Sequence, residues 1–186
     1  MTTRSRRRDD LRRRLTLLLV AGAAISVLGL TLAMGASARQ DILDTVHAVT
    51  ARYHSLQQAL RAGYEPFYVC TEQPGEGAMG QHFVKFSLVG DPAIDPLQPE
   101  ALVYEPQPNG GYKLVALEWV RVGPETNPAP TVLGQPMTHV PSGNRYGIEP
   151  DGFYQRHYWL YRDNPSGAFA DWNPRVSCGD QGDGGG

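Results

Sequence analysis

The sequence has only two cysteines and none of the short motifs that mark common catalytic sites. It contains no G-x-S-x-G nucleophile elbow, no H-E-x-x-H zinc motif, no C-x-x-C pair and no P-loop. Each of these motifs concentrates the reacting or ligating groups of its chemistry on one short segment. Their absence removes the simplest signatures of a serine hydrolase, a zinc protease, a dithiol redox protein and a P-loop nucleotide hydrolase.

Basic residues are scarce after the first 38 positions. Seven of the 17 Lys and Arg residues and two of the 19 acidic residues precede Arg39, which leaves 10 basic against 17 acidic residues and a net charge of −7. A nucleic-acid interface needs a basic patch that faces the phosphates. The part of the chain from Arg39 onward is therefore expected to bind no nucleic acid.

The first 38 residues have the organisation of an export signal. An arginine-rich start is followed by an uncharged apolar run at residues 15–34 and by Ala36-Ser37-Ala38, the small-x-small pattern that signal peptidase reads. We expect residues 1–38 to be a signal peptide that is cleaved before Arg39, and the protein to be secreted or extracytoplasmic. The apolar run is also long enough to cross a bilayer, so an uncleaved membrane anchor at residues 15–34 is the alternative. Contact with a membrane is expected only in that case.

Both cysteines, Cys70 and Cys178, lie after the export signal. In an oxidising compartment, two cysteines in a small domain most simply form one disulfide, and we expect that bridge here. The alternative is two free thiols, one of them a nucleophile, which would be exposed to oxidation outside the cell. The single domain is expected to span residues 39–178, followed by a disordered glycine-rich tail at residues 179–186.

The hydrophobic pattern predicts an α+β fold, with one long N-terminal amphipathic helix packed on a mostly antiparallel β-sheet. Apolar residues after Asp41 recur in steps of four and three as far as Gly63, at Ile42, Val46, Val49, Tyr53, Leu56 and Leu60. Runs typical of strands follow at residues 67–70, 81–89, 101–105, 112–122 and 157–161. Asn109-Gly110 favours a two-residue hairpin turn, which would place Glu118 opposite Ala101 and Glu105 opposite Leu114.

The segment PGEGAMGQHFVKF at residues 74–86 satisfies the spacing G-x-G-x-x-G. In a dinucleotide-binding fold this motif follows a strand and opens a helix, so that the helix N-terminus meets the pyrophosphate. Here the residues after the motif are typical of a strand. We therefore interpret Gly75, Gly77 and Gly80 as a loop that leads into a strand, and we expect no cofactor-binding residues of the nucleotide type.

His82, Glu118 and His157 form the candidate metal site. Glu118 interrupts a run that is apolar on both faces, and a buried carboxylate must be paired, protonated or bound to a cation. Two His and one Glu form a known zinc set whose ligands can come from neighbouring strands, so one divalent transition metal ion is the candidate cofactor. The alternative is structural: Glu118 pairs with Arg, Tyr or Trp, and the histidines satisfy backbone groups.

The C-terminal stretch from His157 is rich in aromatic residues and X-Pro turns, including Trp159 and Trp172. Flat rings between such turns can line a groove for a small molecule, a sugar or a peptide. Aromatic residues also cover hydrophobic cores, and this is the alternative.

Five segments together resemble a family of exported bacterial proteins of unassigned activity, namely AMGQHFV, ALVYEP, KLVALEWV, VLGQP and NPSGAFADWNPRVSC. The resemblance implies a self-contained secreted domain and supplies no reaction. The sequence as a whole favours an envelope module that binds a small ligand or a metal ion. A secreted metal-assisted hydrolase and a structural or protein-interaction domain are the alternatives, and no catalytic residue or oligomeric state is assigned.

Overall fold

The computed structural model describes residues 38–148 and 150–179. The chain divides after Asp41 into two compact units, and every strand described below belongs to the second unit, which begins at Ile42. The expected export signal, with its alternative anchor at residues 15–34, lies outside the described residues, as does the expected tail beyond Gly179. Within the described part of the chain, no helix has the length and hydropathy needed to span a membrane.

The helical segment consists of three pieces. Residues 38–50 are α-helical, Ala51–His54 form the 3₁₀ helix η1, and Leu56–Arg61 form the short α-helix α2. Ser55 has an extended backbone between η1 and α2. The single long helix expected from the sequence is therefore not confirmed.

Thr50 lies where the α-helix gives way to η1, and its side chain supplies a local cause for the change. Its hydroxyl donates a hydrogen bond of 2.6 Å to the carbonyl oxygen of Val46, and such bonds to the preceding turn bend helices. Val46 is buried as expected, whereas Val49 and Leu60 are exposed, and Thr50 and Ala59 are buried in their place.

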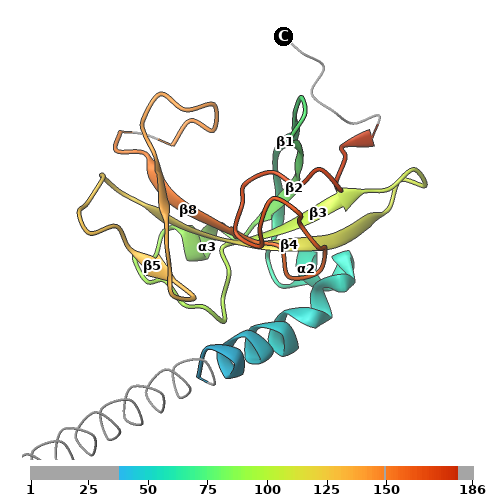
Figure 1. The fold of residues 1–186 in the computed structure, drawn as a ribbon, viewed down its shortest axis with the longest axis horizontal. Coiled ribbons are helices and arrows are strands. Elements are labelled where there is room, and N and C mark those ends of the chain that lie inside the picture. Colours follow the sequence, from blue (N-terminus) through green and yellow to red (C-terminus); the bar gives the residue numbers. More distant parts are fainter. Residues whose placement is uncertain (1–37, 149, 180–186) are drawn as a thin grey trace, which may run out of the picture. The chain divides into compact units, whose positions relative to one another are not determined.

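Six strands form one sheet in the order β1-β2-β3-β4-β8-β7, and every pairing is antiparallel. Figure 1 shows the β1–β2 hairpin in green and the β3–β4 hairpin in yellow. β5 and β6 pair separately, and α3 is one helical turn after β2. The α+β class with an antiparallel sheet is thus confirmed. The strands are β1 (Glu65–Gln73), β2 (Gly77–Val84), β3 (Ala101–Pro106), β4 (Tyr112–Val122), β5 (Thr131–Val132), β6 (Gln135–Pro136), β7 (Thr138–Val140) and β8 (Phe153–Tyr158), and α3 is Phe86–Val89.

The β3–β4 hairpin has a different turn from the expected one. Gln107 and Gly111 are hydrogen-bonded across a three-residue loop that includes Gly110, whose φ is 79°. This loop pairs Glu105 with Lys113, so the predicted pairing of Glu105 with Leu114 is wrong. A bulge further along the hairpin restores the register by one residue. Glu118 therefore pairs with Ala101, as predicted.

The two faces of the sheet are covered differently. Direct partners and residues two apart share a face, so Phe83, Leu102 and Leu117 lie on one side. They pack in the main core with the helical residues Val46 and Tyr53. The opposite side carries a smaller buried cluster that includes Val103, Ala116, Trp159 and both cysteines. The candidate metal site lies on this second side.

Gly77 and Gly80 have structural roles in the β1–β2 hairpin. Gly77 opens β2, and a Cβ there would lie 2.1 Å from the carbonyl oxygen of Asn173. Gly80 has a φ of 97°, and a Cβ there would lie 2.8 Å from Cγ1 of Val103. Gly75 lies in the turn before β2, but Gly77 and Gly80 lie within the strand itself, so the predicted loop is confirmed only for Gly75. The glycines within the strand allow close packing and left-handed backbone.

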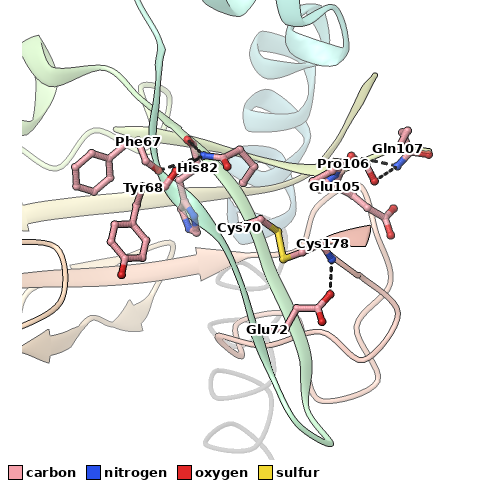
Figure 2. Close-up of a disulfide and its surroundings, with 10 residues drawn as sticks. Phe67, Tyr68, Cys70, Glu72, His82, Glu105, Pro106, Gln107 and Cys178 are labelled. Atoms are coloured by element: carbon pink, nitrogen blue, oxygen red, sulfur yellow. Dashed lines mark hydrogen bonds between the residues drawn. A yellow bond between two sulfur atoms is a disulfide. The ribbon is translucent and has the colours of Figure 1, made fainter. Parts of the chain in front are cut away.

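A disulfide joins Cys70 on β1 to Cys178, which confirms the expected bridge. Figure 2 shows this bridge beside the backbone N–H of Cys178, which donates to the carboxylate of Glu72. Asn173 also pairs with Ala78 on β2 through an isolated β-bridge. The C-terminal segment is thus fastened to the β1–β2 hairpin at two points. The disulfide is compatible with an extracytoplasmic protein.

Candidate functional site

Three neighbouring strand pairings bring His82, Glu118 and His157 to one face of the sheet. His82 on β2 pairs with Val103 on β3, and Val103 pairs with Ala116 on β4. Glu118 lies two residues beyond Ala116 and therefore on the same face. His157 on β8 is the direct cross-strand partner of Glu118.

The side chains of these three residues meet, and we call them the His–Glu–His cluster. Nε2 of His82 lies 3.0 Å from Nε2 of His157 and 3.3 Å from Oε2 of Glu118. Nδ1 of His157 lies 3.6 Å from Oε1 of Glu118. One potential ligand atom from each residue lies within 4.8 Å of the others. The sequence thus named the three residues, and the fold brings them together.

The small side chain of Ala101 helps to explain how His82 reaches Glu118 across β3. Strands β2 and β4 are separated by two strand spacings, or roughly 9–10 Å. Ala101 is fully buried and is the direct partner of both Val84 and Glu118. A methyl group at this position leaves space above β3 for the longer side chains of His82 and Glu118. A larger residue at position 101 would fill that space.

Burial of the cluster sets the protonation of its members. The side chain of His82 is 14% exposed, that of Glu118 is 6% exposed, and that of His157 is fully buried. Burial, with a smaller effect of His157, lowers the pKa of His82 to about 3, so this ring is neutral and able to bind a metal ion. Burial also raises the pKa of Glu118, an effect that the nearby His157 opposes.

His157 behaves differently because two carboxylates face it. Burial lowers its pKa, but Glu118 and Asp171 outweigh that effect, and the pKa of His157 is raised. Contact with His157 in turn lowers the pKa of Asp171. These two carboxylates favour the protonated form of His157. A metal ion bound at Nε2 would displace the proton on that nitrogen and leave Nδ1–H facing the carboxylates.

Nδ1 of His157 is buried and has no hydrogen-bond partner among the described residues. Oε1 of Glu118 lies 3.6 Å away and Oδ1 of Asp171 lies 3.7 Å away, both beyond hydrogen-bond distance. Buried polar atoms in proteins are nearly all hydrogen-bonded, so an orphaned imidazole nitrogen calls for an explanation. When Nε2 of a histidine binds a metal ion, the other ring nitrogen carries a proton that is usually donated to a carboxylate, and Nδ1 of His157 faces two of them.

The spacing of the donor atoms fits a small transition metal ion. Ligands about 2.05 Å from a tetrahedral zinc ion are about 3.3 Å from one another. The separations at Nε2 of His82 are 3.0 and 3.3 Å, close to that value, and the three donor atoms all lie within 4.8 Å of one another. Two imidazoles and one carboxylate also suit iron(II) sites that keep open coordination positions. The donor set therefore fits a divalent transition metal ion.

A pocket of about 310 Å³ opens beside the cluster, with His82 and Glu118 in its lining. Most of the other lining side chains are apolar, among them Met79, Val84, Val120 and Phe153. The volume lies at the lower end of the range for small-molecule sites, and an apolar lining with few polar groups is typical of such sites. The pocket is thus an apolar chamber with the possible metal ligands in its wall.

An irregular stretch of β1 forms one wall of this pocket. Between the pairs Phe67–His82 and Thr71–Gly80, β1 has three residues where β2 has only Gln81. Tyr68 in this bulge has a φ of 59°, which is uncommon for a residue other than glycine. Figure 2 shows the rings of Phe67 and Tyr68 near the imidazole of His82. The bulge therefore directs aromatic side chains toward the pocket, at a cost in backbone strain.

Gln81 holds the bulge in place. Its Nε2 group donates to the carbonyl oxygens of Phe67 at 3.2 Å, Tyr68 at 2.8 Å and His82 at 3.0 Å. The two N–H groups of this amide are shared among the three oxygens, two of which belong to the irregular stretch of β1. Gln81 therefore links the pocket wall to the strand that carries His82.

Trp159, in the aromatic C-terminal stretch, packs against the site. Trp159 is 4% exposed, and its ring stacks on that of His157 at a centroid distance of 6.2 Å. Its indole N–H donates to the carbonyl oxygen of Ala170 at 2.6 Å. Neither Trp159 nor Trp172 lines the pocket. The ring of Trp159 instead helps to fix the orientation of His157.

Sequence reasoning missed Asp171 and the pocket wall. Asp171 lies in a segment without regular structure, and its approach to His157 depends on the path of the C-terminal segment. Tyr146 lies in a loop and reaches the pocket through ring contacts with Tyr68 at 5.2 Å and Phe153 at 5.9 Å. A loop has no periodicity that would place its side chains, so no signal in the sequence identifies them.

No protein-family model, no curated protein and no solved structure matches the chain.

Proposed function

We propose that this protein is an exported binding module in which His82, Glu118 and His157 hold one divalent transition metal ion in the wall of an apolar pocket. The observation that carries the proposal is the meeting of these three side chains from β2, β4 and β8 on one buried face. Two neutral imidazoles and one carboxylate form a known zinc set that leaves a coordination position open to a ligand. The export of the module is the expectation from the N-terminal sequence.

Three further features support a metal site over a purely structural cluster. His82 is neutral because burial lowers its pKa to about 3, and only a neutral imidazole binds a metal ion. His157 has a buried nitrogen without a hydrogen bond. Asp171 lies 3.7 Å from that nitrogen, where it can orient the ring of a metal-bound His157.

Metal binding by the purified protein tests the proposal. Protein prepared without chelator, and protein stripped with chelator and titrated with zinc, should each bind one metal ion per chain. Zinc should also raise the melting temperature, because a ligand that binds only the folded state stabilises it. Absence of stoichiometric zinc, iron(II), copper or nickel, together with no thermal shift for any of these ions, would overturn the proposal.

Single substitutions locate the site. His82→Ala should abolish the zinc-dependent thermal shift, because a site with three protein ligands rarely survives the loss of one. His82 is the best histidine to change, since His157 is fully buried and its removal would leave a cavity. His54→Ala is the matched control, because His54 is exposed and lies in η1, outside the cluster. It should retain the full shift.

A further inference from the structure

The mouth of the pocket is an exposed apolar surface. Among the described residues six large apolar side chains are exposed, and four of them line this pocket: Tyr68, Val69, Phe86 and Val122, which are 41–51% exposed. Scattered single apolar residues on a surface are ordinary, but a group of them around one cavity marks a binding site. An apolar ligand in the pocket would cover part of this surface.

None of the described residues that line the pocket has a positive side chain that could recognise a charged ligand. No Lys or Arg is among its lining residues, whereas His82 and Glu118 are. In the proposed metal site, two neutral imidazoles and the carboxylate of Glu118 leave a divalent ion with one uncompensated positive charge among its direct ligands. Asp171 is not one of these direct ligands, because its carboxylate faces Nδ1 of His157. A monoanionic donor group at the open coordination position would complete the charge balance.

The wall of the pocket is held in a fixed shape. The bulge at Tyr68 is strained, and Gln81 donates to the carbonyl oxygens of Phe67 and Tyr68 there. The Cys70–Cys178 disulfide anchors the residue that follows Val69. Strained backbone persists where the surrounding structure enforces it, and such places are concentrated at functional sites. The apolar mouth is therefore organised before any ligand arrives, which lowers the entropic cost of binding.

We infer that the pocket takes a small apolar monocarboxylate, with its carboxylate on the metal ion and its hydrocarbon part against the apolar walls. This inference rests on the proposed metal site and names the class of ligand that the site would take. A medium-chain fatty acid combines the single anionic donor with the apolar body that the pocket requires. The 310 Å³ volume suits a molecule of this kind rather than a long lipid.

Octanoate, acetate and octan-1-ol form a matched set of probes for this inference. Acetate has the same head group without the chain, and octan-1-ol has the chain without the charge. Calorimetric titration of the zinc-loaded protein should show that octanoate binds at least tenfold more tightly than either of the others. Octanoate should also bind the zinc-loaded protein at least tenfold more tightly than the zinc-free protein.

Two variants at the mouth and one elsewhere locate the ligand. Val122→Ser and Phe86→Ser should weaken octanoate binding at least fivefold and leave zinc affinity unchanged, because both side chains line the pocket outside the cluster. Val49→Ser is the matched control, since Val49 is a similarly exposed valine that does not line the pocket. It should leave both affinities unchanged.

The outcomes separate this inference from the proposed function. If zinc binds but octanoate is no tighter than acetate, or if Val122→Ser and Phe86→Ser have no effect, the inference is wrong and the metal site stands. Equal binding of octanoate with and without zinc would show an apolar pocket that does not use the ion, which also overturns the inference. If zinc itself fails to bind, both proposals fail.

Discussion

Glu118 and His157 are direct cross-strand partners on β4 and β8, and Oε1 of the carboxylate lies 3.6 Å from Nδ1 of the imidazole. Both side chains are almost completely removed from water. Burial favours the neutral form of each side chain, whereas the attraction between the carboxylate and the imidazolium favours the charged form of both. At His157 the neighbouring carboxylates outweigh burial, and its pKa is raised. The register of two strands thus allows the sheet to keep a carboxylate within an apolar strand.

The substitution Glu118→Gln should separate metal binding from folding. Gln keeps the shape of Glu and can accept hydrogen bonds, but it lacks the charge that a metal ion needs. We expect the zinc-dependent thermal shift to disappear, whereas the free energy of unfolding of the zinc-free protein should change by no more than about 1–2 kcal/mol. Glu105→Gln, on β3 and outside the cluster, is the control and should keep the shift. Retention of the shift in Glu118→Gln would remove Glu118 from the site.

The pH dependence of stability should reveal the buried carboxyl group of Glu100. Glu100 is 2% exposed, and burial raises its pKa from 4.5 to about 7, although Oε2 accepts a hydrogen bond from the Val120 N–H at 2.9 Å. The folded state thus binds this proton more tightly than the unfolded state. Its contribution to stability is complete below pH 4.5 and is lost as the pH rises to about 7.

Glu100→Gln isolates that contribution because it keeps the acceptor oxygen and cannot ionise. We expect wild-type protein to lose on the order of 2 kcal/mol relative to the variant between pH 4.5 and pH 7.5. Urea unfolding of both proteins across this range measures the difference, and other titrating groups cancel in the comparison. A constant difference between the two proteins would show that Glu100 ionises normally in the folded state.

The disulfide should contribute strongly to stability, because it closes a long loop. Cys70 and Cys178 are 108 residues apart in sequence. In the chain-entropy description, the double variant Cys70→Ala/Cys178→Ala should lose up to about 4–5 kcal/mol of unfolding free energy. Alkylation of the wild-type protein in denaturant tests the bridge directly. Without reductant neither cysteine should be labelled, and with reductant both should be.

Gln81 should be needed for the shape of the pocket wall. Gln81→Glu replaces a donor that serves three carbonyl oxygens with an acceptor, so it should destabilise the protein by about 1–3 kcal/mol. Amide exchange at Tyr68 and Val69 should accelerate. Gln107→Glu is the matched control, since Gln107 also donates to two carbonyl oxygens but lies beside the β3–β4 turn. An equal effect of both substitutions would contradict a special role for Gln81.

The local sequence pattern is sufficient to predict one strand, the disulfide and one strand pairing of this protein. Residues 112–122 were predicted as a strand with the bounds that β4 has, and the two cysteines left only one possible intramolecular bridge. The pairing of Glu118 with Ala101 was also predicted, but for an incomplete reason. The turn has three residues rather than two, and a bulge compensates for the difference. Strand content follows from side-chain types, whereas bulges depend on contacts with the rest of the sheet.

Elements that depend on distant contacts were predicted less well. The strand expected at residues 157–161 is β8, Phe153–Tyr158, and the strand expected at residues 81–89 ends at Val84, where α3 follows. The apolar spacing predicts one continuous helical stripe through Leu60, but the helix is interrupted after Thr50 and at Ser55, and Val49 and Leu60 are exposed. Thr50 also contacts Tyr161, more than a hundred residues away, at 2.8 Å between their hydroxyl oxygens. Periodicity contains no information about such a contact.

For the candidate site, too, the sequence accounts for some features and the tertiary structure for others. The sequence by itself singled out His82, Glu118 and His157, because a carboxylate in a doubly apolar strand requires a partner and histidines are the common ligands beside it. Only the tertiary structure decided that the three meet, since their distances depend on the register of four strands and on the small side chain of Ala101. Asp171 and the apolar mouth likewise depend on the path of the disulfide-anchored segment and on the β1 bulge. Residue type determines what a side chain can bind, and strand register and loop path determine what lies within its reach.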